Sequence, residues 1–96
     1  MEENILRKHL VFTGAVQGVG FRWRARHAAQ AAGVTGWVQN AADGSVILEL
    51  QGTEAQLDRV LESLDRSLYI QIEGMDVRRI PLLPEERGFA VRDDRW

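Results

Sequence analysis

The chain contains no cysteine, which excludes disulfide bonds and zinc sites with thiolate ligands. It has only two histidines, His9 and His27, which lie far apart and without a carboxylate-rich ligand spacing. Ordinary structural or surface roles are therefore favoured for both over metal binding or catalysis. The absence of cysteine is also consistent with a cytoplasmic location.

Long apolar runs and a strongly basic balance are missing too. No segment approaches the length of a membrane span, and no secretory signal precedes the first expected strand, so we expect no membrane association. The formal net charge is −2, whereas a sequence-independent nucleic-acid binder needs a cationic face. The 96 residues predict a single domain over residues 1–96, with residues 1–6 as a flexible leader. No apolar surface stripe is evident, so we expect a monomer.

Hydrophobic periodicity predicts strands and helices in alternation. A helix is expected over residues 21–32 and a second from a capping box at Thr53 and Gln56 to about Arg66. Their core stripes are Phe21, Ala25, Ala28, Ala29 and Ala32 in the first, and Leu57, Val60, Leu61, Leu64 and Leu68 in the second. Strands are expected over residues 7–13, 36–40, 46–51 and 75–80, with a short last strand at 89–91.

This order predicts an α+β fold, the ferredoxin-like βαββαβ sandwich. It has an antiparallel sheet with two helices on one face, and here a short fifth strand is added. Gly33 is expected to end the first helix, Ala42-Asp43-Gly44 to form a hairpin turn, and residues 69–74 to form a connection. The crossovers place the first and third strands in the middle of the sheet. The loop after strand one and the second strand then lie near the same end.

Residues 14–22, Gly-Ala-Val-Gln-Gly-Val-Gly-Phe-Arg, link the first strand to the first helix. Helices usually begin with Ser, Thr, Asp or Asn, and none of these occurs between Ala15 and Arg22. The first amides of the helix are therefore expected to be free for water or a ligand. The positive charge of Arg22 near the helix N-terminus opposes the helix dipole, at a cost of about 0.3–1 kcal/mol. An anion bound between the two would be attracted by both the guanidinium and the dipole.

An ordinary tight turn with a solvent-exposed arginine remains the alternative for this loop. A nucleotide-binding P-loop is excluded because no Lys-Ser/Thr pair follows the glycines, and the glycine spacing does not fit the dinucleotide fingerprint. Asn40 is similarly ambiguous. It precedes the expected hairpin, where asparagine is a common turn residue.

The loop motif, together with Gly36-Trp37-Val38-Gln39-Asn40 and Asp43-Gly44, resembles the two signatures of the acylphosphatase family. The resemblance covers residues 7–91. It implies a ferredoxin-like fold, hydrolysis of an acyl phosphate to a carboxylate and inorganic phosphate, and no metal or cofactor. It also implies a catalytic role for Arg22 as the phosphate-binding arginine and for Asn40 as the residue that orients the attacking water. The phosphate cradle that it implies consists of the backbone amides of Gln17, Gly18, Val19, Gly20 and Phe21.

The chain departs from the family's usual pattern at two places. Ala41 stands where a threonine is common, and Tyr69-Ile70 replaces a Gly-Pro turn. Both departures bear on rate and specificity more than on reaction type. An acyl phosphate has a good leaving group, so positioning and charge stabilisation suffice for its hydrolysis. An asparagine cannot act as a general base, so the phosphate itself is expected to take the proton from water.

Two alternatives belong to other functional classes. The first is an anion-sensing ferredoxin-like binding module without catalysis. The second is an RNA-binding module of the same topology, which would stack bases on aromatic residues of its central strands. The third strand, residues 46–51, contains no aromatic residue, which disfavours RNA binding.

Overall fold

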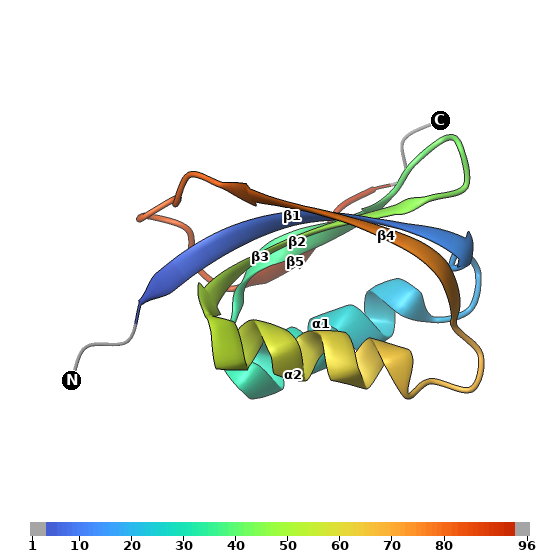
Figure 1. Ribbon diagram of the computed structural model, residues 1–96, viewed down its shortest axis with the longest axis horizontal. Coiled ribbons are helices and arrows are strands. Elements are labelled where there is room, and N and C mark those ends of the chain that lie inside the picture. Colours follow the sequence, from blue (N-terminus) through green and yellow to red (C-terminus); the bar gives the residue numbers. More distant parts are fainter. Residues whose placement is uncertain (1–3, 94–96) are drawn as a thin grey trace.

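The computed structural model describes residues 4–93 and contains one five-stranded sheet with two helices. Both helices lie against the same face of the sheet, as the sequence predicts (Figure 1). In chain order, the elements are β1 (Ile5–Ala15), α1 (Phe21–Ala32), β2 (Thr35–Asn40), β3 (Val46–Thr53), α2 (Glu54–Asp65), β4 (Gln71–Ile80) and β5 (Phe89–Val91).

The strands are ordered β4-β1-β3-β2-β5, which confirms that the first and third strands lie side by side in the middle. Neighbours among β1 to β4 pair antiparallel, with Leu10 opposite Leu48 at the centre. The right-hand end of the sheet in Figure 1 brings together the end of β1, the start of α1 and the β2–β3 hairpin. The expected proximity of the glycine loop and the second strand follows from this arrangement.

The short last strand corrects the expectation of a wholly antiparallel sheet. β5 pairs parallel with β2, with Gly36 opposite Phe89, so the sheet is mixed. After β4 the chain crosses the sheet face that the helices leave open, where Leu83 and Glu86 bond to side chains of β1 and β3. The chain therefore reaches the far edge of the sheet, beside β2, running in the direction opposite to β4. Because β2 also runs opposite to β4, β5 pairs with β2 in parallel.

The core lies between the sheet and the helices. Leu10, Phe12, Leu48 and Leu50 are fully buried from the sheet side. The helices contribute Phe21, Ala25, Ala29, Leu57, Val60 and Leu64, whereas Ala28, Ala32 and Leu61 are partly buried against this cluster. The prediction that Leu68 belongs to the stripe of the second helix is wrong. It is 88% exposed, because α2 ends at Asp65 and no longer sets its direction.

Several element boundaries also differ from the expected ones. β1 begins at Ile5, so Ile5 and Leu6 belong to the sheet rather than to a flexible leader, and residues 1–3 lie outside the described part. β4 begins at Gln71, within the expected connection, because a register shift between Thr13 and Gly14 lets β1 pair on as far as Ala15. Gly33 ends α1 in a left-handed conformation and Thr53 and Gln56 form a capping box, both as predicted.

The open face of the sheet carries a network of ion pairs around the fully buried Arg7. The Arg7 guanidinium donates to Glu49 Oε1 at 2.9 Å and to Glu86 Oε1 at 2.6 Å, and Glu49 Oε2 lies 2.6 Å from His9 Nδ1. Burial raises the pKa of Glu49, but the bonds from His9 and Arg7 outweigh it and hold that pKa below its ordinary value. This network ties the segment after β4 to the centre of the sheet.

Two features are absent from the described residues. None of their helices is long and apolar enough to cross a membrane. No cluster of three or more His, Asp, Glu or Cys residues suited to a metal ion occurs within residues 4–93.

Candidate active site

The loop between β1 and α1 is anchored at two positions and turned by glycines between them. Val16 is fully buried, and Val19 packs against the core. Gly18 and Gly20 have φ angles of 72° and 81°, in the left-handed region that glycine adopts without a steric penalty. Gly20 is the N-cap of α1, so the chain enters the helix directly from this conformation.

No side chain within residues 4–93 caps the start of α1, and its first turn holds no acidic residue. This confirms the expectation of an uncapped helix. The contrast with α2 is direct, since there Thr53 Oγ1 accepts the Gln56 N–H and the Gln56 side chain accepts the Thr53 N–H. An uncapped N-terminus presents backbone donors and a positive dipole end, which together suit an anion.

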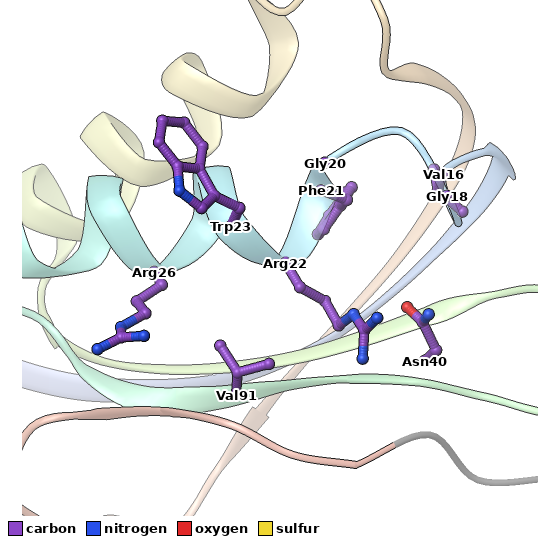
Figure 2. A pocket seen from close by; sticks show the side chains of 9 residues that line it. All are labelled: Val16, Gly18, Gly20, Phe21, Arg22, Trp23, Arg26, Asn40 and Val91. Atoms are coloured by element: carbon purple, nitrogen blue, oxygen red, sulfur yellow. The ribbon is translucent and has the colours of Figure 1, made fainter.

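Arg22 and Asn40 line one cavity of about 400 Å³ at this end of the sheet. In Figure 2 the Arg22 side chain extends from the first turn of α1 toward Asn40, which ends β2. Asn40 is only 5% exposed, so its amide is largely enclosed beside the cavity. The complete lining comprises Val16, Gly18, Gly20, Phe21, Arg22, Trp23, Arg26, Asn40 and Val91.

The residues expected in the phosphate cradle divide into two groups. Gly18, Gly20 and Phe21 line the cavity together with Arg22 and Asn40. Gln17 and Val19 do not line it, because Val19 faces the core and the Gln17 side chain reaches the hairpin. The assignment of their backbone amides to the cradle stays a prediction.

The Gln17 side chain connects the glycine loop to the β2–β3 hairpin. Its amide nitrogen donates to the carbonyl oxygen of Ala41 at 2.7 Å and to that of Ser45 at 2.8 Å. These bonds fix the loop that leads to Arg22 relative to the strand end that carries Asn40. This contact could not be predicted from the sequence, since the partners of Gln17 are 24 and 28 residues away and no local pattern marks them.

The hairpin itself is held by local hydrogen bonds. Asp43 Oδ1 accepts the Ser45 hydroxyl and, at 2.9 Å, the Ser45 backbone N–H. These bonds from Ser45 hold the pKa of Asp43 below its ordinary value. The Ala41 N–H donates to the Ser45 carbonyl, which completes the turn. The two carbonyl groups that Gln17 needs therefore belong to one ordered turn.

Besides the buried Val16, three further residues complete the cavity, and none of these four is among the site residues expected from the sequence. Trp23 and Arg26 come from α1, and Val91 comes from β5. Trp23 is 64% exposed, and its ring lies 4.0 Å from that of His27. Helical spacing from Arg22 could have indicated Arg26 as a neighbour, but only the folded sheet brings Val91 to this place.

The lining is cationic. It contains two arginines and, among the residues that the structure describes, no carboxylate. None of these side chains is a suitable general base at neutral pH. The arrangement can hold a compact anion between a guanidinium and backbone N–H groups, and it can orient a water molecule through the Asn40 amide.

Comparisons with known proteins agree on one family. The family model described as Acylphosphatase matches residues 8–91. The acylphosphatase of Bifidobacterium longum is 42% identical over 91 residues, which cover 93% of this chain and 94% of that protein. The acylphosphatase of Bordetella parapertussis is 43% identical over 84 residues, covering 88% and 82%. The crystal structure of acylphosphatase from Bacillus subtilis matches with a TM-score of 0.83 at 28% identity, covering 91% of this chain and 98% of that one.

Proposed function

The chain belongs to the acylphosphatase family, and from this premise we propose how its residues divide the work of hydrolysis. The activity is the hydrolysis of an acyl phosphate to a carboxylate and inorganic phosphate. Proteins named acylphosphatase match this chain over nearly its whole length. Nothing in these comparisons favours the non-catalytic anion sensor.

In our proposal, the phosphoryl group binds between Arg22 and the backbone amides of residues 17–21. The observation that carries this is the uncapped start of α1 facing the same cavity as the Arg22 side chain. Donors already in place need no reorganisation when charge spreads over the phosphoryl oxygens in the transition state. The planar guanidinium can grip two of these oxygens with parallel hydrogen bonds.

Asn40 is proposed to orient the attacking water. Its amide can accept a hydrogen bond from the water or donate one to it, and its nearly complete burial restricts its orientation. The water oxygen forms a new bond to phosphorus as the bond from phosphorus to the acyl oxygen breaks. The electron pair of that bond leaves with the carboxylate. The proton lost by the water passes to a phosphoryl oxygen, which yields inorganic phosphate.

A steady-state assay on benzoyl phosphate tests these roles. We expect Arg22→Ala and Asn40→Ala each to lower turnover by about 10²-fold or more, as is typical for the loss of one oriented group in such sites. Matched controls are Arg59→Ala and Gln30→Ala, which remove an exposed guanidinium and an exposed amide that do not line the cavity.

Inorganic phosphate should compete with benzoyl phosphate, and its inhibition should weaken in Arg22→Ala more than in Asn40→Ala. Retained turnover in both site variants would contradict the assignment. Competition by phosphate without any hydrolysis in the wild type would favour the sensor instead.

We further propose that the protein acts as a cytoplasmic monomer without a metal or cofactor. The proposed mechanism needs only side chains and backbone groups of one chain, since Arg22, Asn40 and the loop all belong to it. Light scattering across a range of concentrations tests the monomer. Turnover that survives a strong chelator supports the metal-free mechanism, whereas its loss would contradict it.

A further inference from the structure

The cavity extends past the proposed phosphate site. Arg22 points toward Asn40 on one side of Val91, whereas Arg26 descends from the next turn of α1 on the other side (Figure 2). A phosphoryl group held by Arg22 and the loop amides, with its attacking water at Asn40, leaves the part of the cavity around Val91 and Arg26 unused. The acyl group of the substrate must leave the phosphorus on the side opposite the attacking water, so it needs such a place.

Arg26 is available to a ligand in that part. Among residues 4–93 it has no hydrogen-bond or ion-pair partner. The neighbouring Arg24 differs, because its Nε donates to the Ser63 carbonyl and so packs α1 onto α2. Residues four apart on a helix lie on the same face, with Cβ atoms about 5–6 Å from each other. Arg22 and Arg26 therefore both line the cavity, as two cations from one face of α1.

We propose that Arg26 is a specificity residue that binds a second anion at the far end of the acyl group. The preferred substrates are then acyl phosphates whose short acyl chain passes over Val91 and ends in a carboxylate or a phosphate. The inference rests on the proposed placement of the reacting phosphoryl group at Arg22. It goes further by naming the chemical class of the acyl group.

The expected effect is moderate because Arg26 is exposed at the cavity mouth. Water and salt screen such a pair, so its loss should weaken binding by about fivefold rather than by orders of magnitude. A contact made equally in the ground state and the transition state changes KM and leaves kcat. We therefore expect the loss of the Arg26 guanidinium to raise KM, and to leave kcat unchanged, for substrates whose acyl group ends in a second anion.

The test compares succinyl phosphate with butyryl phosphate, which has the same four-carbon chain but ends in a methyl group. We expect the ratio of their kcat/KM values to favour succinyl phosphate in the wild type. The ratio should fall about fivefold in Arg26→Gln, fall less in Arg26→Lys, and shrink in the wild type at high salt. A glyceroyl phosphate with a distal phosphate replaces succinyl phosphate in a second arm, and the larger fall identifies the preferred anion.

The control is Arg59→Gln, which removes one positive charge from the outer surface of α2. An equal fall in the ratio in Arg59→Gln and Arg26→Gln would overturn the proposal, because the preference would then reflect net charge. A ratio unchanged by Arg26→Gln would overturn it as well, while the Arg22 site would stand. If Arg22→Ala still hydrolysed butyryl phosphate at the wild-type rate, the proposed phosphate site would fail first, and the role of Arg26 with it.

Discussion

Gln17 offers a sharp test of how the site is held together. In Gln17→Ala, the hydrogen bonds to the carbonyl groups of Ala41 and Ser45 are lost. A hydrogen bond of this kind contributes about 0.5–1.5 kcal/mol net, so we expect the free energy of unfolding to fall by about 1–3 kcal/mol. For a domain of this size, a loss of 2 kcal/mol lowers Tm by about 8–16 °C.

The catalytic effect of Gln17→Ala should exceed what unfolding explains. Arg22 and the loop amides belong to one side of the lost connection and Asn40 to the other, so their relative position loosens. Small misplacements of reacting groups cost large factors in rate, and we expect kcat to fall about tenfold. The inhibition constant of inorganic phosphate should change by less than about threefold, because in our proposal the loop and Arg22 bind phosphate without Asn40.

Gln51→Ala is the matched control. Gln51 bonds to the Leu83 backbone at 2.8 and 2.9 Å and to Arg7 at 3.3 Å, on the sheet face opposite the helices. Its loss should lower stability comparably and leave kcat of the folded enzyme unchanged. Urea unfolding and steady-state hydrolysis on the same preparations separate the two effects. A wild-type kcat in Gln17→Ala, or equal losses of kcat in both variants, would refute the reasoning.

Further predictions concern stability. The pKa of Glu49 in the folded protein lies below its ordinary value of 4.5, so the ionised Glu49 stabilises the fold at pH values above 4.5, and this stabilisation is lost as the pH falls through the folded pKa. Urea midpoints should therefore drop in acid, and they should drop less steeply in Glu49→Gln. Arg7→Met leaves Glu49 and Glu86 without their shared cation, and the free energy of unfolding should fall by about 2–4 kcal/mol with kcat retained; an unchanged urea midpoint would contradict this. Gly14→Ala places a Cβ atom 2.4 Å from the Gln71 carbonyl oxygen at a φ of 118°, and calorimetry should show a loss of at least about 1–3 kcal/mol from backbone strain alone.

The sequence determined the elements of this protein and most of their order in space. Helix α1 has its predicted bounds, and its glycine cap and the Thr53 capping box were identified correctly. These features depend on hydrophobic periodicity and on the conformations that single residues allow, which are local properties. The sequence also marked Arg22 and Asn40 as candidates, and the structure places both at one cavity.

Contacts between distant segments were decided only by tertiary structure. Nothing near Gln17 in sequence indicates the hairpin carbonyl groups, and nothing near Arg7 indicates Glu86, which is 79 residues away. The parallel pairing of β5, and with it the place of Val91 in the cavity, depends on the path of the chain across the open face of the sheet. Local sequence patterns cannot encode such contacts. The contacts form only when the whole core packs and brings side chains from separate strands within bonding distance.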